Sequence, residues 1–99
     1  MVNHVVLFKM NDYNPEEKKR LTLELKNMLV GLKEKIKEVR HIEVGIHVEP
    51  VAKSYDLALI SHFDTIESLD LYRNHPAHLK VVEFIAKVTR SRAAVDYEF

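Results

Sequence analysis

The sequence contains no cysteine, which excludes disulfide bonds, thiolate nucleophiles and thiolate metal sites. It also has no apolar run that approaches the ~18 residues of a membrane helix, and no basic segment followed by an apolar one at its amino terminus. The 15 Lys and Arg residues balance 15 Asp and Glu residues, so the formal net charge is zero. We therefore expect a soluble, cytoplasmic protein whose partners include neither membranes nor nucleic acid.

The chain of 99 residues is long enough for one domain, spanning residues 1–99, with a single hydrophobic core. Histidine is the unusual component, because 6 imidazoles change the charge of the chain between roughly pH 7 and pH 5.5. They are His4, His41, His47, His62, His75 and His78. The three at positions 41, 47 and 62 belong to no pattern, and we expect them at the surface or at a sheet edge.

Four segments have the residue pattern of β-strands. They are residues 2–10, 39–48, 55–63 and 92–99. The first and third are apolar on both faces, as expected for strands that are covered on both sides. The second alternates apolar and polar residues, which predicts a half-buried strand, and a turn is predicted at residues 50–54.

Two stretches between these strands have helical spacing. Asn14 and Pro15 predict the start of the first helix, since asparagine caps a helix and proline suits its first turn. The stripe that this helix buries is expected to contain Leu21, Leu25, Met28, Leu29 and Leu32. The helix is expected to weaken at Gly31, and Asp64 or Thr65 is expected to cap the second stretch.

Residues 71–78 contain a helix break within the second stretch. Pro76 has no N–H and disfavours helical geometry in the residue before it, so one helix should end near Asn74 and another should begin at Pro76 or Ala77. Tyr72, His75 and His78 are spaced three apart, so they can project to neighbouring positions even across a kink. The spacing is compatible with a small acid/base site and also with a well-capped helix corner.

The order strand, helix, strand, strand, helix pair, strand predicts an α+β ferredoxin-like sandwich, βαββαβ with its second helix broken at Pro76. In that architecture a four-stranded antiparallel sheet carries helices on one face only. Two of the strands nevertheless have apolar residues on both faces, and a monomer would expose a patch larger than a few hundred Å². We therefore predict a homodimer in which a second copy covers the free face of the sheet.

Several segments together carry a resemblance to a known family. They are residues 3–9, 39–45, 55–59, 75–78 and 95–97, together with Phe63 and Tyr72. Over nearly its whole length the chain resembles the stress-responsive dimeric α/β-barrel (Dabb) family. The resemblance implies a ferredoxin-like protomer whose sheet meets that of a second copy in an eight-stranded dimeric α/β barrel.

The family includes polyketide cyclases such as olivetolic acid cyclase, in which a histidine and a tyrosine close a linear polyketide by an aldol reaction without a cofactor. The resemblance implies that His78 and Tyr72 correspond to this catalytic pair and that His4 corresponds to a pocket histidine. Another pocket histidine of that enzyme falls where this sequence has Leu57, so the chain departs from the pattern at that position.

An aldol closure needs a base of near-neutral pKa and a donor that stabilises the oxyanion. His78 could be the base and Tyr72 the donor, and the positive end of the helix dipole would keep the imidazole neutral. Alternatively, these two side chains bond only each other or nearby backbone across the kink. His75 is expected to bond backbone groups freed at the helix break, although we also retain it as a ligand contact.

We expect a small apolar carbonyl compound to bind in a cleft between helices and sheet, beside Tyr72 and His78. The other expected ligand contacts are His4, His75, Leu25, Met28, Leu57 and Leu59. No metal or cofactor is expected, because His75 and His78 have no acidic residue beside them in the local sequence. The chain could also be a cofactor-independent cyclase, a structural dimer without catalysis, or a barrel of the cofactor-free monooxygenase type.

Overall fold

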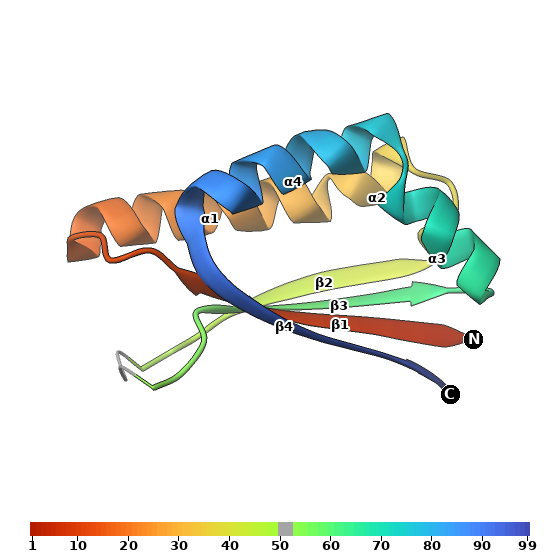
Figure 1. Ribbon diagram of the computed structural model, residues 1–99, viewed down its shortest axis with the longest axis horizontal. Helices are drawn as coiled ribbons and strands as arrows, with labels where there is room; N and C mark the ends of the chain where they lie inside the picture. The colour runs from red at the N-terminus through yellow and green to blue at the C-terminus, as the bar shows by residue number, and fades with distance from the viewer. Residues whose placement is uncertain (50–52) are drawn as a thin grey trace.

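A single antiparallel sheet and a layer of helices make up the computed structural model, which describes residues 1–49 and 53–99 (Figure 1). The elements in chain order are β1 (Val2–Met10), α1 (Pro15–Val30), α2 (Leu32–Lys35), β2 (His41–Ile46), β3 (Leu57–Phe63), α3 (Ile66–Arg73), α4 (Pro76–Val88) and β4 (Thr89–Glu98). The strands lie in the order β2-β3-β1-β4. The predicted α+β class and ferredoxin-like order are therefore confirmed.

Side-chain caps fix where the helices begin. At α1 the side chain of Asn14 accepts the backbone N–H of Glu17 at 2.9 Å, and the proline that follows occupies the first turn. At α3 the cap is Thr65 and not Asp64, because its hydroxyl accepts the N–H of Ser68 at 3.1 Å. These contacts explain why the chain turns into helix at the positions that the sequence predicted.

The strand boundaries differ from the prediction by a few residues. β2 is shorter than the predicted segment 39–48, because Val39 is buried in the core before the strand begins. β4 begins earlier than residue 92, since Thr89 already pairs with Met10 beside an irregularity in the register. The turn predicted at residues 50–54 lies partly outside the described residues.

The helices all cover one face of the sheet, and the core lies between the two layers (Figure 1). On β1 and β3 the side chains that point to the helices are buried. They are Val2, His4, Val6, Phe8, Met10, Leu57, Leu59, Ser61 and Phe63. The stripe of α1 meets them through Leu21, Leu25 and Leu29. This alternation decides which parity of β1 faces the helices, a choice that the sequence left open.

The opposite face of the sheet carries apolar side chains that no described element of the protomer covers. Val5 pairs with Ile60 on one side and with Val95 on the other, so the three form a row across the sheet. Val95 is 56% exposed and the neighbouring Tyr97 is 48% exposed. Among the described residues, no helix is both long enough and apolar enough to cross a bilayer.

Candidate functional site

A cavity of about 350 Å³ lies between α4 and the helix-facing side of the sheet. Its apolar wall includes Val6, Phe8, Leu29, Leu59, Val82 and Ile85. Its polar side chains are His4, Arg73, His78, Thr89 and Arg92. A volume of this size and a mostly apolar wall with a few convergent polar groups are typical of a small-molecule site.

His78 is placed on this wall by the start of α4. Its Nδ1–H donates to the backbone carbonyl of Arg73 at 3.0 Å, since a carbonyl can only accept, so Nε2 is left as the acceptor of a neutral ring. Burial lowers the pKa of His78, and nearby positive charge from Arg73 and Arg92 lowers it further, while the bond to the carbonyl opposes both effects. The lowered pKa agrees with the sequence argument, which attributed the neutral ring to the helix dipole, but its main cause is burial.

Tyr72 lies behind His78 and does not line the cavity. The two ring centroids are 4.4 Å apart, and the ring of Phe63 lies 4.9 Å from Tyr72 on another side. The hydroxyl of Tyr72 is buried and has no hydrogen-bond partner in the part of the chain that the structure describes. Burial raises the pKa of this phenol, so the group stays protonated and can act as a donor but not as a base.

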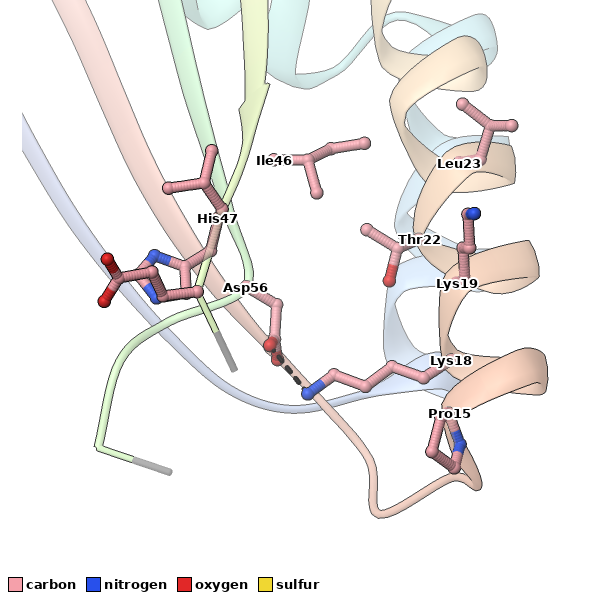
Figure 2. A pocket seen from close by; sticks show the side chains of 10 residues that line it. Pro15, Lys18, Lys19, Thr22, Leu23, Ile46, His47 and Asp56 are labelled. Carbon is pink, nitrogen blue, oxygen red and sulfur yellow. Dashed lines mark ion pairs between the residues drawn. The ribbon is translucent and has the colours of Figure 1, made fainter. Parts of the chain in front are cut away.

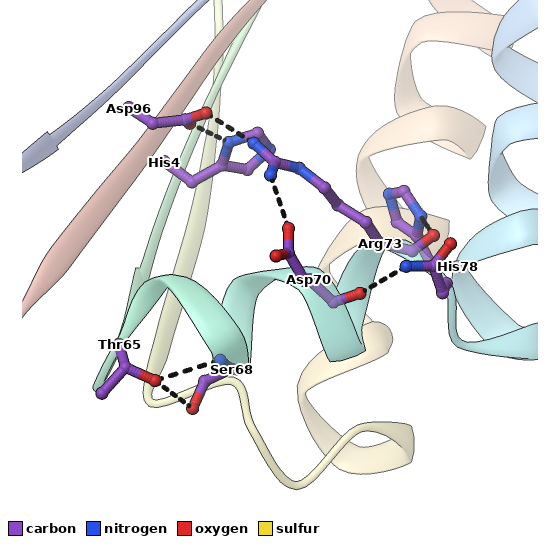
Figure 3. Close-up of polar contacts among 8 residues, drawn as sticks. His4, Thr65, Ser68, Asp70, Arg73, His78 and Asp96 are labelled. Carbon is purple, nitrogen blue, oxygen red and sulfur yellow. Dashed lines mark hydrogen bonds and ion pairs between the residues drawn. The ribbon is translucent and has the colours of Figure 1, made fainter.

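A chain of hydrogen bonds and ion pairs runs beside the cavity from β1 through β4 to α3 (Figure 3). His4 on β1 bonds Asp96 on β4 through Nδ1, and the other carboxylate oxygen of Asp96 accepts from Arg73 at 2.5 Å. Arg73 also donates to Asp70 at 3.0 Å. Asp96 therefore bonds both His4 and Arg73, and its contact with Arg73 connects the edge strand β4 to α3.

His4 is a second buried imidazole on the same wall. Its pKa is lowered because burial outweighs the raising effect of Asp96, whose charge is shared with Arg73. A neutral His4 donates its Nδ1–H to Asp96 and keeps Nε2 as an acceptor. The cavity is thus bounded by two neutral imidazoles from different elements.

His75 has a structural place at the helix break. Its Nδ1 accepts the backbone N–H of Ala77 at 3.0 Å, so it is the N-cap of α4. It does not line the cavity beside His78.

The four apolar residues expected to contact a ligand are separated by the fold. Leu59 lines the cavity, whereas Leu25 and Leu57 are buried in the core and lie off its wall. Met28 is half-buried and lines a different hollow on the outer side of α1. Among these residues only Leu59 shares a surface with the two imidazoles.

Three charged residues at the site were missed by sequence reasoning: Arg73, Arg92 and Asp96. The last two lie on β4, on the parity that alternates with the apolar residues of that strand. Because Arg92 pairs with Phe8 and Asp96 pairs with His4, both face the helix layer. The charged residues at alternate positions of the final strand were the signal in the sequence that could have identified Arg92 and Asp96.

A second hollow, of about 450 Å³, lies between the start of α1 and the end of β2 (Figure 2). It is crossed by an ion pair of 2.9 Å between Lys18 and Asp56. The other carboxylate oxygen of Asp56 accepts the backbone N–H of Met10 at 2.7 Å. Its buried charge is therefore already neutralised, and this hollow lacks the paired imidazoles of the first cavity.

No group of three or more His, Cys, Asp or Glu side chains arranged to hold a metal ion occurs within residues 1–49 and 53–99. The cavity wall itself carries imidazole and guanidinium groups.

Fold and cavity together define a ferredoxin-like α+β protein with a mostly apolar cavity between its second helix pair and the sheet. The chain matches the stress responsive A/B barrel domain, Dabb, over residues 2–99 and belongs to this family. It is 31% identical over 102 residues to the stress-response A/B barrel domain-containing protein DABB1 of Arabidopsis thaliana, a match that covers 98% of the chain and 46% of that protein. The chain thus spans about half the length of this relative.

Two solved structures illustrate the range of the fold. A dimeric protein of unknown function from Bacteroides fragilis shares 38% identity and superposes with a TM-score of 0.90, covering 99% of this chain and 95% of that one. A hydroxynitrile lyase from Passiflora edulis shares 14% identity with a TM-score of 0.76, covering 97% and 90% of the two chains. The second likeness shows the fold alone.

Proposed function

We propose that this protein is a homodimer that binds a small, mostly apolar carbonyl compound in the cavity beside His78. The observation that carries the proposal is the cavity itself, in which an apolar wall meets the acceptor nitrogens of two neutral imidazoles. Such a wall favours the carbon skeleton of a ligand, and the few polar groups orient it.

The dimer is supported by the uncovered apolar row on the sheet and by the relative from Bacteroides fragilis, which is described as dimeric. A second copy related by a two-fold axis would place the same row against itself. Sheet against sheet, the two protomers would close into a barrel and leave the cavity of each under its own helices.

A neutral methyl ketone, 2-nonanone, tests the binding site. We expect it to shift the backbone amide resonances around His78 and Val82 when it is titrated into the ¹⁵N-labelled protein. Ala86 lines the cavity, so Ala86→Phe fills part of it and should weaken binding about tenfold or more. Leu79→Phe is the matched control, because Leu79 is exposed on the same helix and does not line the cavity. Binding that survives Ala86→Phe unchanged would remove this site.

A second candidate is a cofactor-independent enzyme of the polyketide cyclase type. It is favoured by the free Nε2 of His78, a base that burial keeps neutral near pH 7. In this candidate His78 takes a proton next to the carbonyl and Tyr72 donates to the oxyanion that forms. Because Tyr72 does not line the cavity and lies behind His78, its hydroxyl could contact the oxyanion only if the oxyanion passed the ring of His78.

Deuterium exchange next to the carbonyl of 2-nonanone in D₂O separates the two candidates. Catalysis predicts that the protein accelerates exchange and that His78→Gln lowers this acceleration by about 10²-fold while 2-nonanone still binds. Binding without accelerated exchange would leave the non-catalytic function and remove the enzyme.

A further inference from the structure

The cavity wall carries two guanidinium groups and no carboxylate. Arg73 is already neutralised, because it donates to Asp70 at 3.0 Å and to Asp96 at 2.5 Å. Arg92 makes no hydrogen bond or ion pair within the residues that the structure describes. One of the two positive charges on this wall is therefore without a counterion among the described residues.

The position of Arg92 directs this charge to the cavity, and its side chain remains exposed to solvent. Arg92 pairs with Phe8 in the sheet, and paired residues of neighbouring antiparallel strands project from the same face. Phe8 is buried under the helices and lines the apolar wall, so the arginine side chain leaves β4 on the same side. A mostly apolar cavity with an exposed, unneutralised cation on its wall matches a ligand that is apolar at one end and anionic at the other.

We propose that the cavity takes a carboxylic acid with an apolar body, whose carboxylate is bound by Arg92 while its carbon skeleton lies along Phe8 and Val82 near His78. A planar guanidinium binds a planar carboxylate through two parallel hydrogen bonds, and a single unneutralised cation matches one negative charge. This inference rests on the proposed small-molecule site and names the class of its ligand.

Octanoate and 2-nonanone form a matched pair of probes, because both carry the same heptyl chain and only octanoate is charged near neutral pH. We expect the wild-type protein to bind octanoate about tenfold or more tightly than the ketone by isothermal titration calorimetry. Arg92→Met should weaken the binding of octanoate far more than the binding of 2-nonanone, so that most of this preference is lost. Arg90→Met is the control, since Arg90 lies on the same strand but donates to Asp12 and does not line the cavity.

The outcomes separate this inference from the proposed function. If neither probe binds, the small-molecule site itself is overturned and the ligand class falls with it. If the ketone binds as well as octanoate, or if Arg92→Met keeps the full preference, the acid ligand is overturned and the apolar site stands. An unchanged amide spectrum of the Arg92→Met protein shows that the variant is folded, which is expected because Arg92 is exposed.

Discussion

The two imidazoles of the cavity wall are held by different partners but share one electrostatic property. His78 bonds a carbonyl and His4 bonds a carboxylate, yet burial lowers the pKa of both rings. At neutral pH each therefore presents an unprotonated nitrogen, which suits hydrogen bonding to a ligand or removal of a proton from it.

This arrangement predicts how stability depends on pH. Because the folded pKa values of His4 and His78 lie below the unfolded value of about 6.5, the unfolded chain binds protons first as the pH falls. The stabilisation that comes from keeping these rings neutral is complete above that value and is lost as the pH falls through the folded pKa values. Urea titrations should show the free energy of unfolding decreasing from pH 7 to pH 5, and His78→Gln should reduce this decrease.

Proton NMR of the imidazole resonances measures the cause directly. The His78 signal should titrate at lower pH in the folded protein than in the same protein in concentrated urea. A folded-state titration at or above the value in urea would contradict the electrostatic account of the site.

We predict that the substitution Tyr72→Phe stabilises the folded protein. The substitution removes a buried hydroxyl that has no partner among the described residues and keeps the ring contacts with Phe63 and His78. We expect the free energy of unfolding to rise by about 1 kcal/mol, because an unsatisfied buried polar group costs about 1–3 kcal/mol. Tyr97→Phe is the control, since that exposed hydroxyl accepts from Asn3 and its loss should change stability little. A clear loss of stability in Tyr72→Phe would mean that the hydroxyl is satisfied in solution.

At the scale of elements, the break between α3 and α4 depends on one capping side chain. His75 accepts the N–H of Ala77, and His75→Ala would leave that donor unpaired at the start of α4. Loss of an N-cap costs about 0.5–2 kcal/mol, which thermal unfolding can measure. His75→Asn should restore most of the stability, because asparagine is a strong cap. Equal losses in both variants would show that capping is not what His75 contributes.

Local signals were sufficient to predict most elements. Asn14 and Pro15 begin α1 and Pro76 begins α4, because caps and proline act within a few residues and need no tertiary context. The start of β4 was placed too late because Thr89 and Arg90 have no distinctive strand pattern. Their pairing with β1 depends on contacts that are distant in the sequence.

The site was predictable only in part for the same reason. The spacing within residues 71–78 indicated that Tyr72 and His78 would meet, and their ring centroids are 4.4 Å apart. The position of His75 before Pro76 also indicated a bond to backbone groups at the helix break, and its Nδ1 accepts the backbone N–H of Ala77. The roles of Arg92 and Asp96 depend on the register of β4 against β1, which a single sequence does not specify.

At the scale of the whole molecule, the exposed face of the sheet predicts the effect of one charge on assembly. Ile60 lies near the middle of that face, paired with Val5 on one side and Glu43 on the other. If a second copy covers this face, Ile60→Lys would bury a charged ammonium group at the interface, and even beside Glu43 the removal of this charge from water would cost several kcal/mol. We expect wild-type protein to sediment at twice the mass of the chain, and the Ile60→Lys dimer to dissociate at least about 100-fold more readily.

The control places the same charge on the other side of the molecule. Leu79 is 49% exposed on α4, so Leu79→Lys should leave the dimer intact. Circular dichroism of both variants establishes that each protomer is folded before its mass is compared. A wild-type chain that sediments as a monomer at every concentration would contradict the dimer, and so would an Ile60→Lys protein as dimeric as the control. In either case the apolar row on the sheet would have to be explained by a different partner, because an uncovered patch of this kind is unfavourable in water.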